Sequence, residues 1–346
     1  MILNTYAILL GFLALLQLLV SGLVLVTGGL ACRGCMKPLA AEERTALEHR
    51  SYLLLLLTML VLGVNLASWP LLYLLLQSYV PEWSGVMCIY GVMQVGKGSM
   101  GPSRYLPGLL AFLQAVKPAL VFLGGAWFTL YLLNRRTRTA PLMRRILLLL
   151  VPLAILAAAD AAAELAYIGI PKKEEFPTSG CCTMSYEQPA TSPLAQPATF
   201  GRGDEQWLST AYFAVNIALL LALLASSRLT GTRQLTVAMA ALLCLGLIAA
   251  WIAKSFLVDV AAPALLHLPY HHCPYDLLPQ APEAVLAIVY FVGGCFFLGW
   301  AAVVCWLGRG PETEPFLSET VRTLLRASFW SILLSVVLLS LELALA

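Results

Sequence analysis

The sequence predicts an all-α, polytopic membrane protein that crosses a bilayer about eight times. Three observations predict this class. Hydrophobic residues make up 60% of the 346 residues and charged residues only 11%, whereas soluble domains carry about 25% charged residues. Apolar runs of roughly 20 residues, the length that spans the hydrocarbon layer, recur along the chain. No alternating β-barrel pattern is present, and a helix satisfies its own backbone groups in lipid.

The apolar runs set the expected helices. The first run has no basic segment before it and is too long for a signal-peptide core, so it counts as a helix. Prolines at 70, 118 and 152 fall inside runs, where neighbouring helices can compensate for the lost backbone donor. Residues 1–346 are read as a single integral membrane domain, built either as one bundle or from two four-helix halves. The runs are 6–30, 52–77, 107–133, 146–170, 207–227, 234–258, 284–307 and 326–345.

The distribution of Lys and Arg predicts the orientation. The odd-numbered loops hold 14 of the 21 basic residues and the even-numbered loops hold 5, while Lys117 and Lys254 lie within runs. Because basic loops stay in the cytoplasm, we expect both termini outside, in a plasma membrane such as the bacterial inner membrane. Loops 78–106, 171–206 and 259–283 then form an outer cap.

The charge pattern excludes nucleic acid as a partner. The net charge is only +3, and the basic residues stand in short loops that are too small to track a phosphate backbone. No Gly-rich nucleotide-binding signature is present. The expected partners are the lipid bilayer and, for one class of function, other membrane or periplasmic subunits.

Four cysteines fall in the expected outer cap: Cys88, Cys181, Cys182 and Cys273. An even number of cysteines in an oxidising compartment predicts disulfides. Adjacent cysteines seldom bond to each other, so one of Cys181 and Cys182 is expected to reach Cys88 and the other Cys273. The alternative is a redox-active pair that passes electrons to a quinone in the membrane.

Three histidines and a cysteine cluster in the last outer loop, at His267, His271, His272 and Cys273. Imidazole and thiolate are preferred ligands of zinc and copper, and imidazole also binds haem iron. This segment is therefore a candidate metal or haem site, unless a disulfide uses Cys273. The motif Cys273-Pro274-Tyr275 also echoes Cys88-Ile89-Tyr90, which favours two related halves.

A C-x-x-C pair, Cys32 and Cys35, follows the first run on the cytoplasmic side. A reactive pair gains its low thiol pKa at a helix N-terminus, whereas this pair follows a helix C-terminus. We expect it to be reduced and without a metal.

Four charged residues lie inside apolar runs: Lys117, Asp160, Glu164 and Lys254. Charges at this depth are costly and mark functional sites by default. Asp160 and Glu164 share a helix face, and the depths predict the ion pairs Lys117–Asp160 and Lys254–Glu164. Such pairs either join helices or line a proton path or polar substrate cavity. Polar side chains that could extend the network are Gln17, Asn65 and Asn216.

Three classes of function remain open from the sequence. The first is a redox protein or redox-complex subunit that uses the outer Cys and His residues, with a metal ion, haem or quinone as cofactor. The second is a transporter of a small solute or metal ion that uses the intramembrane charges. The third is a non-catalytic anchor or assembly subunit whose cap docks a partner.

Overall fold

A computed structural model gives the fold of most of the chain. It describes residues 4–34, 41–83, 86, 88–97, 99–137, 139–172, 205–229, 232–267 and 273–346, with side chains except at 31–34, 41–52, 205, 232 and 233. Every regular element in these ranges is a helix, and no strand occurs among them. The predicted all-α class is therefore confirmed.

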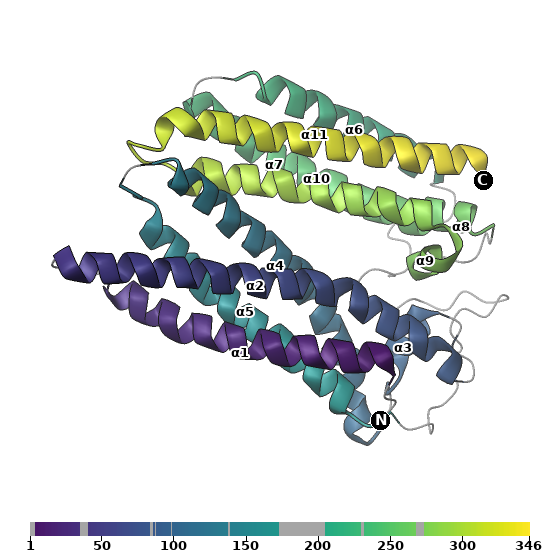
Figure 1. Ribbon diagram of the computed structural model, residues 1–346. Coiled ribbons are helices and arrows are strands. Elements are labelled where there is room, and N and C mark those ends of the chain that lie inside the picture. Colours follow the sequence, from purple (N-terminus) through teal and green to yellow (C-terminus); the bar gives the residue numbers. More distant parts are fainter. Residues whose placement is uncertain are drawn as a thin grey trace. The chain divides into compact units, whose positions relative to one another are not determined.

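Eight helices in the described residues are long and apolar enough to cross a membrane. Each coincides with one of the apolar runs to within a few residues at the end of the run, so the prediction of eight apolar helices of membrane-spanning length is confirmed (Figure 1). Prolines lie inside α2, α4 and α5, as expected. The helices are α1 (Thr5–Gly34), α2 (Ala41–Tyr79), α4 (Leu106–Arg135), α5 (Met143–Gly169), α6 (Glu205–Ser226), α7 (Thr232–Phe256), α10 (Pro282–Leu307) and α11 (Glu314–Leu345).

The chain divides into two compact units, Met1–Ser179 and Gly180–Ala346, with four of these helices in each. In the first unit α1 packs against α2 and α5, and α4 packs against α5 and α2. In the second unit α6 packs against α7 and α11, and α10 packs against α7 and α11. Both units therefore have the same cyclic order of neighbours, as expected for consecutive antiparallel helices.

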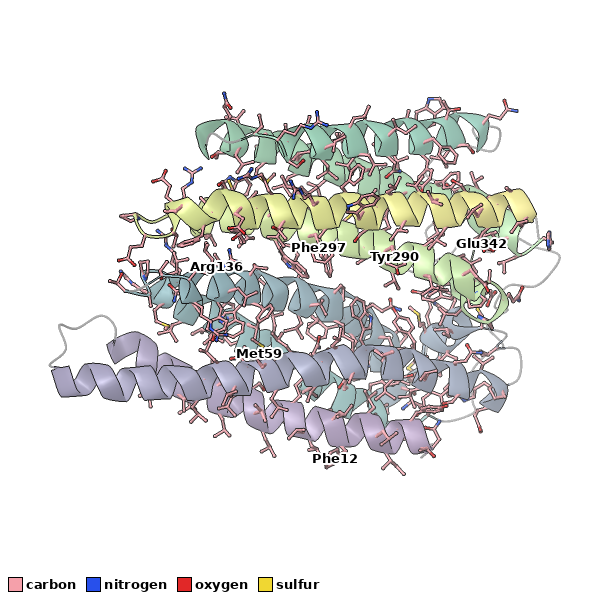
Figure 2. All side chains as sticks on the ribbon, turned by 45° about the horizontal axis from the view of Figure 1, so that its top comes forward. Phe12, Met59, Arg136, Tyr290, Phe297 and Glu342 are labelled. Atoms are coloured by element: carbon pink, nitrogen blue, oxygen red, sulfur yellow. The ribbon has the colours of Figure 1, made fainter. Side chains whose placement is uncertain are left out.

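Large apolar side chains are exposed along the lengths of these helices. Phe12 of α1 is 65% exposed and points away from the other helices of its unit (Figure 2). Val237 and Leu247 of α7 are 69% and 72% exposed. A soluble protein rarely leaves so much apolar surface in water, so lipid is the natural solvent of these faces.

The connections between the second and third long helices of each unit contain short helices rather than irregular chain alone. Within the described residues, the first unit has η1 (Val80–Glu82), α3 (Ile89–Gln94) and η2 (Pro102–Tyr105) in this connection. The second has a π-helical segment η3 (Leu257–Ala261), then α8 (Ala262–Leu265), η4 (Pro274–Asp276) and α9 (Leu277–Gln280).

The last helix begins earlier than its sequence suggests. Its first residue is Glu314 and Thr313 occupies the N-cap position, whereas the apolar run begins only at residue 326. The Thr313 hydroxyl donates to the Gly308 carbonyl at 2.6 Å and holds the preceding turn. Pro315 is accepted in the first turn because its missing N–H would have no partner in the helix.

Glycines allow close helix approach in both units. A Cβ atom on Gly294 of α10 would lie 2.5 Å from Cγ1 of Ile332 in α11. The Ser328 hydroxyl of α11 donates to the Gly294 carbonyl at 2.8 Å. In the first unit, a Cβ on Gly124 of α4 would collide with the side chain of Leu62 in α2. Small residues serve this purpose in membrane helices generally.

Candidate functional site

The centre of the first unit holds a group of six polar side chains that are at most 1% exposed. We call them the Lys117 cluster. All four long helices of the unit contribute to it, with one residue each from α1 and α4 and two each from α2 and α5. The members are Gln17, Asn65, Ser68, Lys117, Asp160 and Glu164.

The cluster lies deep within the spans. Lys117 is eleven residues from the first residue of α4, and at 1.5 Å per residue this is about 16 Å along the helix. Asp160 is nine residues before the last residue of α5, or about 14 Å. Because the hydrocarbon layer is about 30 Å thick, these charges lie far from either headgroup region.

One ammonium group contacts two carboxylates in the cluster. The Lys117 Nζ atom lies 2.5 Å from Oε1 of Glu164 and 3.2 Å from Oδ2 of Asp160. It also donates to the Ser68 hydroxyl at 2.8 Å. All three ionisable side chains are fully buried, so solvent does not weaken these interactions.

The amides of α1 and α2 hold one oxygen of Asp160. Nε2 of Gln17 donates to Oδ2 of Asp160 at 3.0 Å and to the Ala157 carbonyl at 3.0 Å. Nδ2 of Asn65 donates to the same Oδ2 at 3.2 Å. Together with the ammonium of Lys117, three donors converge on this atom. All four long helices of the unit thus meet at this one carboxylate oxygen.

The local sequences explain how the cluster forms. Asp160 and Glu164 are four residues apart, and Asn65 and Ser68 are three apart, so each pair lies on one face of its helix. The segment of α5 around the two acids is almost entirely alanine, at positions 157–159 and 161–163. Small side chains let α1 and α4 approach closely, which brings Gln17 within reach of the α5 backbone.

The structure brings together three of the four expected intramembrane charges. The expected ion pair between Lys117 and Asp160 is present. The ion partner of Glu164 is also Lys117, so its assignment to Lys254 was wrong, because one lysine reaches two acids that lie one turn apart. Lys254 belongs to the second unit, where its ammonium lies 5.5 Å from the centre of the Trp251 ring.

Two of the three expected polar extensions join the cluster. Gln17 and Asn65 do so, whereas Asn216 of α6 donates to the Tyr212 carbonyl of its own helix at 2.9 Å. Ser68 also belongs to the cluster but was not expected from the sequence. Its spacing of three residues from Asn65 is the signal that would have found it, although serines are common in membrane helices.

The cysteines and histidines of the expected cap are only partly described. Cys181, Cys182, His271 and His272 lie outside the described residues, as do the side chains of Cys32 and Cys35. The disulfide, redox and metal hypotheses that depend on them therefore remain predictions. His267 is exposed and has a φ of +52° just after α8, a left-handed conformation in which histidine is several-fold enriched.

Cys88 and Cys273 take corresponding places in the two units. Both side chains are buried. Cys88 is the N-cap residue of α3 and Cys273 is the N-cap residue of η4, each in the connection between the second and third long helices of its unit. This is the equivalence that the repeated C-x-Y motif suggests, although the relationship between the halves remains a hypothesis.

Lys172, which follows α5, was not singled out from the sequence. Its side chain is 7% exposed and donates to the Tyr167 carbonyl at 2.7 Å. The ammonium lies 4.4 Å from the centre of the Tyr167 ring and 5.6 Å from that of Tyr79. Burial lowers the pKa of Lys172 to about 8. A lysine next to a helix C-terminus is ordinary in sequence, so no local pattern distinguishes this one.

Comparison with known proteins does not identify a relative of this chain. No family model, no curated protein and no solved structure matches this chain. The functional argument therefore rests on the residues themselves.

Proposed function

We propose that this multi-pass membrane protein is an ion-coupled transporter, in which the Lys117 cluster binds one proton or one monovalent cation. The single observation that carries the proposal is the ratio of charges in the cluster. Two carboxylates, Asp160 and Glu164, contact one ammonium, and all three groups are fully buried.

The charge count distinguishes this site from a structural ion pair. One acid would be enough to neutralise Lys117, and the second leaves one negative charge in excess. The neighbouring helices α1 and α2 supply only the neutral side chains Gln17, Asn65 and Ser68. An unpaired charge inside a membrane costs several kcal/mol, so the cluster is expected to hold a compensating proton or cation.

Oxygen atoms are available to receive such an ion. Among the described residues, Gln17 Oε1, Asn65 Oδ1 and Asp160 Oδ1 are buried and accept no hydrogen bond. The amide groups of Gln17 and Asn65 lie next to Asp160, because their nitrogens donate to its Oδ2 atom. Carboxylate and amide oxygens are the ligands that hard cations prefer. The same oxygens suit a proton shared with a water molecule.

Two of the contributing helices contain a proline beside a cluster residue. Pro70 follows Ser68 by two residues in α2, and Pro118 directly follows Lys117 in α4. Each proline removes one backbone donor and weakens its helix locally. Interrupted helices at the depth of the binding site are a recurring feature of transporters. A bend at these positions would expose the cluster to one side of the membrane.

The alternative classes have less support. The redox and metal hypotheses rest on Cys181, Cys182, His271 and His272, which lie outside the described residues. An anchor or assembly subunit needs no charge excess inside its bundle.

Ion binding can be tested on the purified full-length protein in lipid nanodiscs. Thermal unfolding is followed between pH 5 and 8, and at constant ionic strength with Na⁺, K⁺ or Li⁺ in place of N-methylglucamine. We expect acidification or one of these cations to raise the midpoint for the wild type. Glu164→Gln, which balances the charges, should abolish this response.

The matched control is Glu82→Gln, which changes an exposed acid of the same unit. This variant should respond as the wild type does. Equal responses of the wild type and Glu164→Gln to pH and to every cation would refute ion binding at the cluster. Transport itself is tested with proteoliposomes, by a pH-sensitive dye if acid stabilises the wild type and by uptake of the stabilising cation if Na⁺, K⁺ or Li⁺ does. An imposed gradient of that ion should drive a flux that Glu164→Gln removes.

A further inference from the structure

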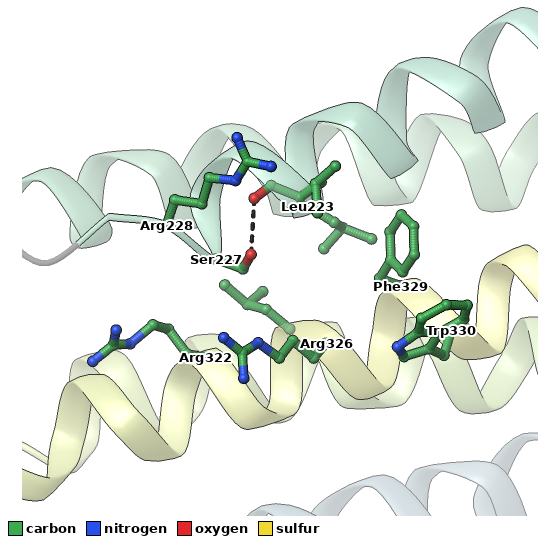
Figure 3. Close-up of a pocket in the computed structure, with 9 residues that line it drawn as sticks. Leu223, Ser227, Arg228, Arg322, Arg326, Phe329 and Trp330 are labelled. Carbon is green, nitrogen blue, oxygen red and sulfur yellow. Dashed lines mark hydrogen bonds between the residues drawn. The ribbon is translucent and has the colours of Figure 1, made fainter.

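The second unit contains a pocket of about 470 Å³ between the end of α6 and the first half of α11 (Figure 3). It is independent of the Lys117 cluster, since all of its lining residues belong to Gly180–Ala346. Three arginines line it, one after α6 and two on α11. The rest of the lining is apolar apart from one serine. The residues are Leu223, Leu224, Ser227, Arg228, Arg322, Leu325, Arg326, Phe329 and Trp330.

The charge of the pocket is not compensated within the described residues. Among them, no carboxylate lies within ion-pair distance of Arg228, Arg322 or Arg326. The Nε atom of Arg322 donates to the Ser318 carbonyl of its own helix at 3.2 Å, which leaves its terminal nitrogens available. Guanidinium groups bind phosphate oxygens through paired hydrogen bonds. A pocket with three of them favours a phosphate-bearing anion.

The pocket is polar at one end and apolar at the other. Along α11, Arg322, Arg326 and Trp330 follow one another at intervals of four residues, which is about 6 Å per step and keeps them on one face. On the antiparallel α6 side, Arg228 likewise lies one turn beyond Leu224. The arginines of both segments therefore lie toward the end of the unit where α6 ends and α11 begins, and the apolar residues lie deeper in the spans.

This polarity matches an amphiphile that stands parallel to the helices. Leu223 and Leu325 are fully buried and form the inner wall, whereas Trp330 is 60% exposed. Tryptophan is enriched where the headgroup region meets the acyl chains. A free phosphate ion would use the arginines and leave the apolar half of the pocket without a role.

We propose that this pocket binds one anionic phospholipid, with its phosphate held by Arg228, Arg322 and Arg326 and its acyl chains lying against Phe329 and Trp330. The three arginines count among the basic residues of the odd-numbered loops, which are expected on the cytoplasmic side. The lipid then belongs to the inner leaflet, where basic pockets between helices hold anionic headgroups.

The test uses the full-length protein in detergent, with lipid binding measured by native mass spectrometry and by thermal stabilisation. The probes are phosphatidylglycerol, phosphatidylcholine with the same acyl chains, and inorganic phosphate. We expect phosphatidylglycerol to bind at least about tenfold more tightly than phosphatidylcholine. The two headgroups share the phosphate, but phosphatidylcholine adds a quaternary ammonium that the three arginines repel. Inorganic phosphate should not stabilise the protein at equal concentration.

The matched variants are Arg322→Gln with Arg326→Gln in the pocket and Arg135→Gln with Arg144→Gln, two exposed arginines of the first unit. Only the pocket pair should weaken phosphatidylglycerol binding, by about tenfold or more. Trp330→Ala, which keeps all three arginines, should weaken lipid binding as well. Equal binding of the two lipids, equal loss in the control pair, or stabilisation by phosphate that matches the lipid would each overturn the proposal.

Discussion

The ammonium nitrogen of Lys117 lies 2.5 Å from a carboxylate oxygen of Glu164, and both side chains are completely excluded from solvent. This contact joins α4 to α5 at a depth where neither group can reach water. The same ammonium also contacts Asp160 at 3.2 Å. Lys117 is thus the only cation for two acids among the described residues of the cluster, and its removal should have larger consequences than the removal of either acid.

Lys117→Met is therefore expected to be the most destabilising single change in the cluster. It leaves two adjacent carboxylates without a counter-charge, and an unpaired buried charge costs about 3–5 kcal/mol. The free energy of unfolding can be measured by denaturant titration in mixed micelles. Lys97→Met, at an exposed lysine of the same unit, should change stability by no more than about 0.5 kcal/mol. Equal effects of the two substitutions would show that the ionic contacts do not stabilise the fold.

Two substitutions at Asp160 separate the role of its charge from the role of its hydrogen bonds. Asp160→Asn keeps one acceptor oxygen for the donors from Gln17, Asn65 and Lys117. Asp160→Ala removes this acceptor. Gln17 keeps the Ala157 carbonyl and Lys117 keeps Ser68 and Glu164, whereas Nδ2 of Asn65 loses the acceptor that it uses, and an unsatisfied buried group costs about 1–3 kcal/mol. We expect Ala to be the more destabilising of the two by at least about 1 kcal/mol in the same unfolding assay. If the two variants unfold alike, the convergence of donors on Oδ2 contributes nothing to stability.

The number and type of spans could be predicted from the sequence because lipid imposes a strict rule. A backbone in hydrocarbon must be helical, and a helix must be long enough to cross. The individual charges in the runs could be found for the same reason, since each is exceptional there. Which charges meet could be predicted only in part. Lys117 and Asp160 lie at similar depths, but depth does not specify which helices are neighbours.

The contact between Glu164 and Lys117 was missed because the ion pairs were predicted from depth in the membrane alone, with one lysine assigned to each acid. Packing in the first unit lets one lysine contact two acids on successive turns of α5. The start of α11 was missed for a different reason. Its first turns are amphipathic and lie outside the apolar run, so hydropathy sets the span at 326–345, whereas the backbone is already helical from Glu314.

Lys172 should make the stability of the protein depend on pH. Burial lowers its pKa from the ordinary value of 10.5 to about 8, so the native state binds fewer protons than the unfolded state between these values. Stability then rises as pH increases from about 8 to 10.5, and the penalty of the buried ammonium is fully present below about pH 8. We expect the unfolding midpoint of the wild type to rise over this window relative to that of Lys172→Met.

The comparison with Lys172→Met cancels the contributions of all other titrating groups. A constant difference between the wild type and Lys172→Met from pH 7 to 10 would contradict the lowered pKa. In that case the cation–π contacts with Tyr79 and Tyr167 would outweigh the cost of burial.

Adjacent glycines in α10 provide a matched test of helix packing in the second unit. A Cβ on Gly294 would lie 2.5 Å from Cγ1 and 3.2 Å from the backbone nitrogen of Ile332, whereas a Cβ on Gly293 would meet nothing within 4 Å. Gly294→Ala should therefore force α10 and α11 apart and cost about 1–3 kcal/mol. Gly293→Ala should be neutral or stabilising by up to about 1 kcal/mol, because alanine is the better helix former. Thermal unfolding of the two variants in nanodiscs measures the difference. In an Ile332→Ala background, which lacks the colliding Cγ1 atom, the loss caused by Gly294→Ala should be smaller. Equal midpoints for the two alanine variants would mean that the contact between α10 and α11 at Gly294 is looser than the structure describes.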